Sequence, residues 1–343
     1  MQVIRHYSNV PVDARGAVVA IGNFDGVHRG HQAVVARAAA LADEMGVPLG
    51  VIIFEPHPRE YFNAKGPNFR LTSFHSKARL LERLGVDILY VLSFDSAMAN
   101  KTAPDFVLDV LVRGLGVLHA VVGYDFTFGR GRSGNVGVLS WIGLMEGFGV
   151  TVVEPVVRPR DEEGAGEIFS SSRIREHIEA GEMRKAARLL GHWWSVEGHV
   201  RRGEGRGREL GFPTVNLDLG RSVTPALGIY AVWAEAQVAA PGGGERLQRV
   251  YPGAGYVGTK PTFANAPVQL EVHLLDADDE LYGRLMRVSF IDFIRPDAAF
   301  ADAAQLKTKM AEDCAEARKI LKEPWARLDA FDEGLDAVGG VGR

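Results

Sequence analysis

Ile21-Gly-Asn-Phe-Asp-Gly-Val-His-Arg-Gly-His31 places two histidines three residues apart, at the point where an apolar run gives way to a helical pattern. The apolar run, residues 17–21, is short, as expected of a buried parallel strand. Glycines and an aspartate predict a turn directly after it, and residues 32–45 have the pattern of a helix that Gly46 ends. The stretch therefore predicts a strand, a tight turn and a helix, with both imidazoles near the first helical turn.

A helix start of this kind attracts anions, because its first backbone N–H groups have no partner inside the helix and the positive end of the helix dipole lies there. Ring N–H donors of His28 and His31 would add charge stabilisation during phosphoryl chemistry. A glycine at position 30 lets a phosphate approach the backbone. We therefore expect a nucleotide site at this turn, with ATP bound by Gly22, Asn23, Phe24 and Gly30.

Two other interpretations of the histidine pair are open at this point. Histidines at a helix start are often ordinary surface residues. A metal site is the second alternative, although the sequence offers no third His, Cys or acidic ligand at a recognisable spacing. The nucleotide interpretation is favoured because a second apolar strand, residues 49–54, follows the helix.

The composition is that of a globular protein with two domains. The chain has 343 residues, which is more than a single core usually holds, and 46% of them are hydrophobic. A net charge of −4 with no basic block argues against general nucleic-acid binding. A single cysteine excludes an intramolecular disulfide, and no apolar run resembles a signal peptide or a membrane span. We expect a cytoplasmic enzyme that acts on small molecules, with no nucleic-acid or membrane partner.

The first half of the chain alternates strands and helices. After residues 49–54, the pattern predicts a helix over 76–84, a strand over 88–92, a helix over 104–113 and a strand over 120–122. Such alternation predicts a doubly wound, Rossmann-like parallel α/β sheet. Ligands of these sheets bind beyond the carboxyl ends of the strands, where the strand order reverses.

Candidate ligand-binding turns follow all four predicted strands. The histidine stretch follows the first strand, Phe54-Glu-Pro-His-Pro58 the second, Phe94-Asp95 the third, and a glycine- and arginine-rich segment, residues 123–134, the fourth. Each of them alone could be only a turn, but four at one sheet edge indicate a site. Further on, Ser170-Ser-Ser-Arg173 opens a predicted helix. The serines alone indicate a plain N-cap, whereas Arg173 beside the helix N–H groups suits the phosphates of ATP that leave as pyrophosphate.

Beyond a predicted helix at residues 183–190, the pattern changes to short strands and glycine-rich turns, which predicts an antiparallel β-barrel. In Pro213-Thr-Val-Asn216, strand alternation points the Thr214 hydroxyl and the Asn216 amide the same way, as two neutral oxygen ligands for Mg²⁺. In Leu270-Glu-Val-His273, the glutamate shares a strand face with the histidine. Such a carboxylate is more often a solvated surface group, and as a general base Glu271 would need a substrate hydroxyl within reach. A final helix, residues 300–321, is expected to pack on the barrel.

Together these motifs resemble the bacterial bifunctional riboflavin kinase/FAD synthetase family over residues 15–320. That family begins with a nucleotidyltransferase domain whose His-x-Gly-His motif is matched by residues 28–31 and whose Ser-Ser-Thr-Arg-type motif is matched by residues 170–173. Ser172 replaces the usual threonine and keeps the hydroxyl. The resemblance implies that His28, His31 and Arg173 are catalytic and that Ser171 and Ser172 bind ATP.

The flavin-binding turns of the family are matched as well. Its Phe-x-Pro-His-Pro turn corresponds to residues 54–58, and its glycine-rich aromatic loop to residues 123–131. A later match includes Arg295-Pro296. The resemblance implies flavin contacts by Phe54, Pro56, His57, Pro58, Asp125, Phe126, Phe128 and Arg295.

The second half resembles the riboflavin kinase domain of the same family, an antiparallel barrel with a C-terminal helix. The resemblance implies that Thr214 and Asn216 bind the metal and ATP, and that Glu271 accepts the proton of the ribityl 5′-hydroxyl. Gly205 and Gly207 are expected to bind ATP. The chain departs from the family pattern at Val215, where alanine is commoner, and at Tyr256-Val-Gly258, where the family has Asn-Ile-Gly.

We therefore expect a two-step enzyme that uses ATP and Mg²⁺. Residues 186–325 would phosphorylate riboflavin to FMN, residues 1–185 would adenylylate FMN to FAD and release pyrophosphate, and residues 326–343 would form a C-terminal tail. Two alternatives are a nucleotidyltransferase for another phosphorylated acceptor and a flavin-binding or regulatory protein that retains the fold.

Overall fold

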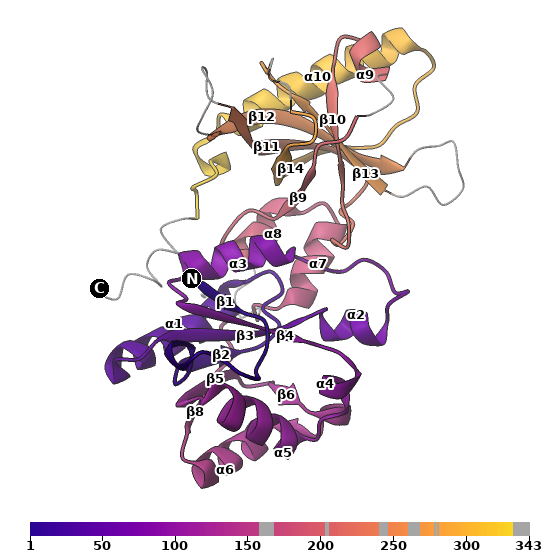
Figure 1. Cartoon of the computed structure of the whole chain (residues 1–343). Coiled ribbons are helices and arrows are strands. Elements are labelled where there is room, and N and C mark those ends of the chain that lie inside the picture. The colour runs from indigo at the N-terminus through magenta and orange to yellow at the C-terminus, as the bar shows by residue number, and fades with distance from the viewer. Residues whose placement is uncertain are drawn as a thin grey trace. The chain divides into compact units, whose positions relative to one another are not determined.

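The chain folds into two compact units (Figure 1). The computed structural model describes residues 1–157, 168–202, 206–239, 246–259, 268–277, 279 and 281–331. Among these, the first unit comprises Met1–Pro67 and the described part of Lys77–Ser170, and the second comprises Asn68–Ser76 and the described part of Ser171–Glu333. The limits expected for the functional domains, 1–185 and 186–325, stay a prediction.

The first unit is built on a six-stranded parallel sheet in the order β1–β4–β3–β2–β5–β8. Strand order reverses at β2, which pairs with β3 on one side and β5 on the other. The turns after β2 and β5 therefore lie where doubly wound sheets bind ligands, and the predicted fold class is confirmed. The strands are β1 (Gln2–Ile4), β2 (Val18–Ile21), β3 (Leu49–Glu55), β4 (Ile88–Ser93), β5 (His119–Gly123) and β8 (Gly149–Val153).

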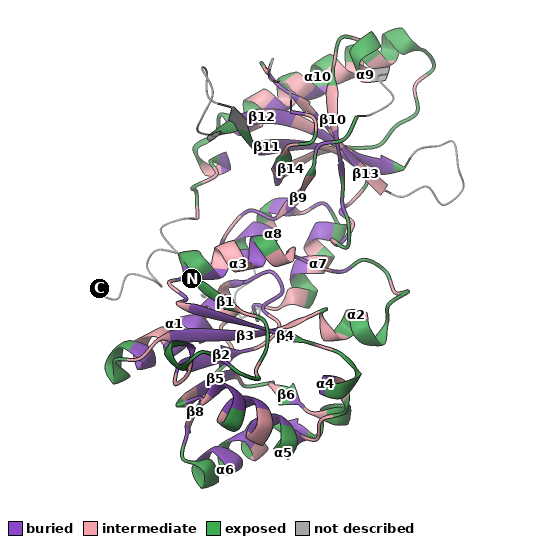
Figure 2. Ribbon diagram, in the orientation of Figure 1, coloured by how far each residue is buried: buried purple, intermediate pink, exposed green. Residues whose placement is uncertain are grey.

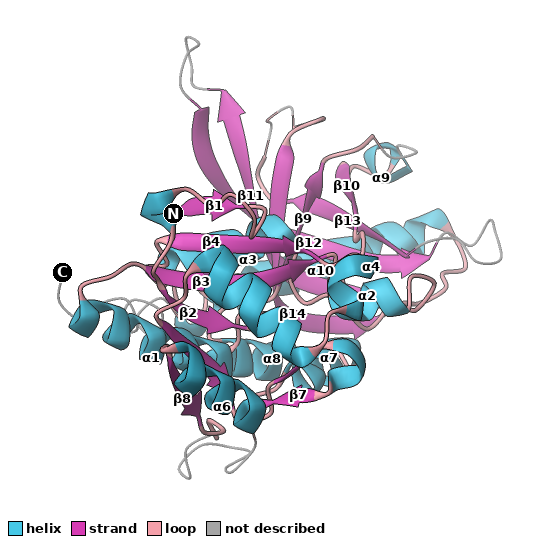
Figure 3. Cartoon of the chain, turned by 60° about the horizontal axis from the view of Figure 1, so that its bottom comes forward, coloured by secondary structure: helices cyan, strands magenta, loops and turns pink. Residues whose placement is uncertain are grey.

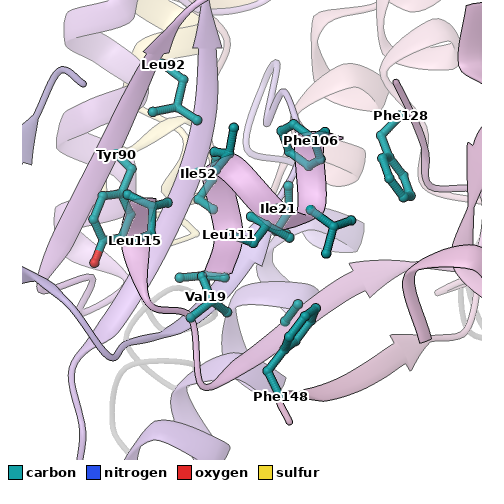
Figure 4. Close-up of a cluster of buried hydrophobic side chains, with 14 of the residues drawn as sticks. Val19, Ile21, Ile52, Tyr90, Leu92, Phe106, Leu111, Leu115, Phe128 and Phe148 are labelled. Carbon is teal, nitrogen blue, oxygen red and sulfur yellow. The ribbon is translucent and has the colours of Figure 1, made fainter. Parts of the chain in front are cut away.

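The central strands of this sheet are buried on both faces, as their nearly continuous apolar sequences require (Figure 2). One face packs against the helices η2 and α6, which contribute Leu111, Leu115 and Leu139 to the core (Figure 4). The helix α1 packs against β2, β3 and β5. The remaining elements of this unit are η1 (Val12–Ala14), α1 (Arg29–Met45), α2 (Pro58–Phe62), α3 (Phe74–Arg83), α4 (Ser96–Asn100), α5 (Ala103–Asp105), η2 (Phe106–Leu115), β6 (Thr127–Phe128), η3 (Arg130–Arg132), β7 (Gly134–Asn135) and α6 (Val136–Glu146).

The helix predicted over residues 104–113 is present, and most of it is a π-helix. The short α5 continues directly into η2, a π-helix of ten residues whose hydrogen bonds span five positions. Gly114, near the end of η2, is closely surrounded by backbone, because a Cβ there would lie 2.6 Å from the Tyr7 carbonyl oxygen and 2.9 Å from that of Asp109. Arg15 donates to the carbonyls of residues 113 and 114 at the helix end. The apolar stripe therefore predicted a helix correctly.

The second unit carries an antiparallel sheet in the order β10–β13–β12–β11–β14–β9 (Figure 3). Its two edges meet at a single bridge beyond β9, where the Arg201 N–H donates to the Asn216 carbonyl at 2.8 Å. The sheet is therefore an antiparallel half-barrel, which agrees with the barrel-type fold expected for this half. The strands are β9 (Ser195–His199), β10 (Thr214–Asp218), β11 (Gly228–Ala239), β12 (Arg246–Thr259), β13 (Val268–Leu274) and β14 (Leu285–Pro296).

The predicted C-terminal helix is present as α10 (Ala303–Leu321), which packs on β11, β12 and β14. Its Ala317 and Leu321 join a core that also contains Ala231 and Ile291 of the sheet. This helix therefore covers part of one face of the half-barrel. The other helices of this unit are α7 (Ser171–Glu179), α8 (Met183–Leu190), α9 (Arg206–Glu209) and η4 (Pro324–Ala326).

Asn68–Ser76 belongs to the second unit although first-unit residues precede and follow it. We call it the crossing segment. Arg70 forms a bridge with Ser222, and the N–H groups of Phe69 and Arg70 both donate to the Arg221 carbonyl, at 3.2 and 3.1 Å. The chain therefore enters the second unit, returns to the first at Lys77, and leaves it again after Ser170.

Candidate active sites

The loop between β2 and α1, residues 22–27, is held in a strained shape; we call it the β2 loop. Phe24 and Val27 adopt φ of 48° and 43°, a region that side chains other than glycine seldom occupy, least of all a β-branched one. Both side chains are fully buried. Strain of this kind persists only where the surroundings over-determine the backbone, and it gathers at functional sites.

His28 is the N-cap of α1, and its Nδ1 accepts a hydrogen bond from the His31 N–H at 3.3 Å. The two imidazole rings stack, with centroids 3.6 Å apart and an interplanar angle of 18°. Phe24 packs against the His31 ring at 5.1 Å. Because Nδ1 of His28 is an acceptor, the neutral ring carries its proton on Nε2. The predicted pair is thus brought together at the start of a 17-residue helix.

Gly30 lies too close to its surroundings for a side chain. A Cβ there would be 3.1 Å from Cε1 and 3.2 Å from Nδ1 of His28, and 3.3 Å from the Phe169 carbonyl oxygen. These distances are tighter than ordinary van der Waals contacts. Glycine at this position therefore allows the His28 ring to keep its place.

Two buried polar side chains that the sequence did not single out donate to the β2 loop. Lys77 of α3 is 1% exposed and donates to the Asn23 carbonyl at 2.8 Å, and its Nζ lies 3.7 Å from Oε1 of Glu55. Gln32 of α1 is 5% exposed and donates to the Val27 carbonyl at 2.8 Å. Because lysines on helices usually face solvent, nothing in the residue pattern indicated that Lys77 is buried.

The predicted flavin residues 54–58 lie at the end of β3 and in the turn that follows it. The Phe54 ring meets that of Phe94 edge-on at 5.9 Å and that of Phe106 at 6.1 Å. His57 caps α2, because its Nδ1 accepts from the Arg59 N–H at 3.1 Å, and Pro58 is the first residue of that helix. Pro56 lies between these two aromatic residues in the sequence. An aromatic ring thus lies at the carboxyl end of β3, and a capped helix lies directly beyond it.

The segment after β5 supplies three more of the predicted flavin residues, Asp125, Phe126 and Phe128. Phe126 and Phe128 stack with centroids 5.4 Å apart, and Phe128 lies 5.5 Å from Phe106. Phe106 therefore connects the two predicted flavin turns, and we call the rings of Phe54, Phe94, Phe106, Phe126 and Phe128 the aromatic cluster. Asp125 is exposed in the same turn.

Two residues of α2 extend the aromatic cluster and were missed by the sequence analysis. The rings of Tyr61 and Phe62 lie 5.4 and 5.8 Å from that of Phe94. Phe62 is 71% exposed, which is unusual for a phenylalanine. The signal that could have found them is their position in the first helix after the Phe-x-Pro-His-Pro turn.

Ser171, Ser172 and Arg173 open α7, which belongs to the second unit. The Arg173 guanidinium is half exposed and forms an ion pair with Glu176 on the next helical turn. The helix start predicted from the serines is therefore present. Since the histidine pair belongs to the first unit, its joint action with Arg173 is a proposal.

Thr214, Asn216 and Glu271 share one face of the paired strands β10 and β13. Asn216 lies directly opposite Glu271 in the register, and Thr214 lies opposite His273. The Thr214 hydroxyl donates to Oε2 of Glu271 at 3.3 Å. On β13 the two neighbours of Glu271, Leu270 and Val272, are fully buried toward the core. The alternation predicted for both strands is confirmed.

The same face continues across the sheet toward Arg295. The register pairs Glu271 with Tyr256 of β12, Tyr256 with Ile229 of β11, and Ile229 with Arg295 of β14. The Tyr256 hydroxyl donates to Asp297 at 3.0 Å. Burial, followed by the carboxylates of Asp297 and Glu271, raises the pKa of Tyr256 to about 12. Tyr256 therefore stays a neutral donor at any physiological pH.

Arg295 is engaged by the C-terminal helix. Its Nε and Nη2 donate to the two carboxylate oxygens of Asp313 at 2.8 and 2.6 Å, and the hydrogen bond to Asp313 raises the pKa of Arg295. Two-point pairing of this kind fixes the plane of a guanidinium. Arg295 is therefore rigidly placed in the strand row that contains Glu271, and its contact with a flavin stays a prediction.

Gly207 lies against the strand that carries the proposed metal ligands. A Cβ there would be 2.4 Å from the Phe212 carbonyl oxygen and 3.5 Å from the Thr214 hydroxyl, so the backbone of α9 approaches β10 closely. Gly205, the other predicted glycine, lies outside the described residues.

The donors on the β10–β13 face fit a magnesium ion. A hydroxyl, an amide oxygen and a carboxylate are hard oxygen ligands, and Mg²⁺ in enzymes keeps several waters and takes only one or two protein ligands beside substrate phosphates. In the part of the chain that the structure describes, no three His, Cys, Asp or Glu side chains gather in a way that could hold a metal ion. Within the same described residues, no helix is long and apolar enough to cross a membrane.

Two family models match successive parts of the chain. The model for FAD synthetase matches residues 10–171, and the model for riboflavin kinase matches residues 190–321. The first match contains the histidine pair and the aromatic cluster, and the second contains the β10–β13 face.

Relatives match nearly the whole chain. A bifunctional riboflavin kinase/FMN adenylyltransferase from Pseudomonas fluorescens is 38% identical over 321 residues, which cover 93% of this chain and 98% of the relative. The protein of that description from Bacillus subtilis is 36% identical and covers 88% and 91%. A crystal structure described as a macrolide-efflux protein from Streptococcus pneumoniae aligns with a TM-score of 0.77 at 30% identity, covering 92% of this chain and 98% of the other.

Proposed function

Since the chain belongs to the family of bifunctional riboflavin kinase/FMN adenylyltransferases, we propose a location within it for each of the two reactions. The enzyme phosphorylates riboflavin to FMN with ATP, and it adenylylates FMN to FAD with release of pyrophosphate. We place adenylylation at the β2 loop and the start of α1, and phosphorylation at the β10–β13 face. Its small-molecule substrates are accordingly riboflavin, FMN and ATP.

In the proposed adenylylation, an oxygen of the FMN phosphate attacks the α-phosphorus of ATP and pyrophosphate leaves with the electron pair of the broken P–O bond. The nucleophile is already an anion, so the step needs no protein base. The ring N–H donors of His28 and His31, together with the backbone N–H groups of Gly22, Asn23, Phe24 and Gly30, would stabilise the charge on the phosphoryl oxygens. The observation that carries this assignment is the stacked histidine pair at the N-terminus of α1.

Arg173 would bind the departing β- and γ-phosphates, with Ser171 and Ser172 as further donors at the start of α7. Its half-exposed guanidinium forms an ion pair with Glu176 on the next helical turn, and an exposed pair of this kind contributes little to stability. A phosphate could therefore compete with that carboxylate for the guanidinium.

The aromatic cluster suits the isoalloxazine ring of FMN. The rings of Phe54, Phe94 and Phe126 lie at or just after the carboxyl ends of β3, β4 and β5, and stacking on aromatic side chains is an interaction that a flat aromatic ring system favours. His57, Pro56, Pro58 and Asp125 would border the same site, as the family resemblance implies. This arrangement would bring the flavin to the edge of the sheet on which the histidine pair lies.

In the proposed phosphorylation, the ribityl 5′-hydroxyl oxygen attacks the γ-phosphorus, ADP leaves, and Glu271 accepts the hydroxyl proton. A carboxylate can do so only when it is within hydrogen-bond reach of that hydroxyl. The hydrogen bond from Thr214 orients the Glu271 carboxylate. Arg295 would contact the flavin from the same strand row, and Gly207, with Gly205, would lie against ATP.

Thr214 and Asn216 would hold the Mg²⁺ that accompanies ATP. When bound, the ion neutralises phosphate charge and helps to align the phosphates. The face built by these two residues and Glu271 offers only oxygen donors, which is the chemistry this ion requires. The cytoplasmic location expected from the sequence stays a prediction.

A time course with both substrates tests the order of the two reactions. The purified chain is incubated with riboflavin, Mg²⁺ and excess ATP, and the flavins are separated by chromatography. We expect FMN to form first and FAD to follow. FMN alone would limit the chain to phosphorylation, and bound but unchanged riboflavin would favour a flavin-binding protein.

Gly30→Ala is expected to slow adenylylation about tenfold, since the new methyl group displaces the His28 ring by a few tenths of an ångström and misplaced catalytic groups are costly. The rate of FAD formation from supplied FMN measures the effect. Riboflavin phosphorylation by the same variant is the internal control and should not change. An unaltered rate of FAD formation would show that the ring position is not critical.

A further inference from the structure

We propose that Lys77 is a positioning residue for adenylylation: its buried ammonium group holds the β2 loop in the strained shape that places the histidine pair. The inference rests on the placement of adenylylation at His28 and His31 proposed above. It assigns a role to a residue that neither the sequence motifs nor the family resemblance singled out.

The β2 loop is strained at two positions. Val27, a fully buried β-branched residue, has φ of 43°, and Phe24 has φ of 48°. Residues of these types leave that region when nothing restrains them. Contacts outside the loop must therefore hold both residues, and these contacts indirectly set the geometry of the site.

Two buried side chains donate to the loop close to its strained positions. Lys77 donates to the carbonyl of Asn23, the residue before Phe24, and Gln32 donates to the carbonyl of Val27. A carbonyl fixed on each side of the turn leaves the peptide units between them little freedom to rotate. The β2 loop is thus restrained at both ends by side chains from two different helices, α3 and α1.

The charge of Lys77 is buried. Lys77 is 1% exposed, and burying an ammonium group is expensive unless it is paired and hydrogen-bonded. The ammonium group donates to the Asn23 carbonyl and lies 3.7 Å from the Glu55 carboxylate at the end of β3. An apolar side chain of this size would fill the space at a lower cost. The ammonium group therefore links the turn after β2 to the end of β3, at the edge where the nucleotide site is proposed.

The β2 loop is in direct contact with the histidine pair. Phe24 packs on the His31 ring at 5.1 Å, and Val27 immediately precedes His28, the N-cap of α1. Release of the Asn23 carbonyl would let Phe24 relax and shift the stacked rings. Because Lys77 is almost fully buried, it acts through the loop and not by contact with the substrate.

The test compares Lys77→Met with Gln32→Met and with a matched control. Tyr90→Phe is the control, because the buried Tyr90 hydroxyl donates to the Ala14 carbonyl at 2.7 Å, in the same unit but not at the β2 loop. For adenylylation of supplied FMN, we expect Lys77→Met to lower kcat about 10- to 100-fold while the KM for FMN changes less than about twofold. Gln32→Met should shift kcat in the same direction, and Tyr90→Phe should not. Riboflavin phosphorylation should be unchanged in all three.

The proposal is overturned if Lys77→Met has a normal kcat, or if its only effect is a lower melting temperature like that of Tyr90→Phe. A rise in the KM for FMN without a loss of kcat would also overturn it. If the methionine variant does not fold its first unit, Gln32→Met decides, since an unaltered kcat there would disprove restraint of the loop by side-chain donors. A normal rate of FAD formation by a His28→Ala, His31→Ala double variant would instead contradict the placement of adenylylation.

Discussion

FAD formation is expected to fall at least about 10³-fold when His28 and His31 are both replaced by alanine, whereas FMN formation from riboflavin stays unchanged. Removal of a single positioned donor to a developing oxyanion typically slows a reaction by about 10²–10³-fold. Here the two stacked rings are lost together, and the cap on α1 is lost with them. The measurement is the initial rate of each reaction, with FMN and riboflavin supplied separately.

His6→Ala is a suitable control for this double variant, since His6 is an exposed histidine of the first unit to which no role is assigned. Its rates should match those of the unaltered enzyme. Loss of both reactions in the double variant would contradict the assignment of separate sites.

Glu271→Gln is expected to lower kcat for riboflavin phosphorylation by about 10²–10⁴-fold, the usual contribution of a general base. Glutamine keeps the size of the side chain and an acceptor for the Thr214 hydroxyl, but it cannot take up the proton of the ribityl hydroxyl. Adenylylation of supplied FMN should proceed at the normal rate. The two rates are measured on one preparation, so a folding defect would be recognised as a loss of both.

Asp218→Asn provides the matched control for this experiment. Asp218 is an exposed carboxylate on β10, on the same face as Asn216, and asparagine keeps the acceptor that the Gly220 N–H uses. We expect a change in kcat of less than about twofold, because a mostly exposed ion pair such as that of Asp218 and Arg201 contributes little. An equally large loss in this variant would mean that any charge on the face matters, and Glu271 would lose its assigned role.

The parallel sheet was predictable because its signal is local. Strand β2 is a short run of apolar residues flanked by turn residues, and burial on both faces requires that composition. The π-helix was not predictable in type, since the same apolar stripe serves helices of either pitch. The helix α6 was missed as well. Its residues are apolar around most of its circumference, and two glycines interrupt them, so no clear helical face stands out.

Among the residues of the candidate sites, too, those marked by a local sequence pattern were predicted and those placed by distant contacts were not. Thr214 was grouped correctly with Asn216, and Glu271 with His273, because strand alternation fixes which side chains of one strand point the same way. That the two strands pair and bring these faces together could not be predicted from either strand alone. The contact of Lys77 with Asn23 links residues 54 positions apart, and no local pattern reports it. The exposed Phe62 was missed for a related reason. Only the contact of its ring with that of Phe94 places it beside the aromatic cluster, and no local pattern reports that contact.

The crossing segment imposes an order on biosynthesis. Asn68 donates to the carbonyl of Gly220, a residue that follows it by 152 positions. At about 5–20 residues per second, a ribosome exposes that partner some 8–30 s after the segment itself has emerged, which is longer than many domains need to fold. The parallel sheet is completed in that interval, because its strands β4, β5 and β8 lie between the crossing segment and Gly220. The nine residues of the crossing segment must therefore remain available for their partners while the parallel sheet forms from the chain on either side of them. Because the segment interrupts the sequence of the first unit, no single cut in the gene would separate one complete unit from the other.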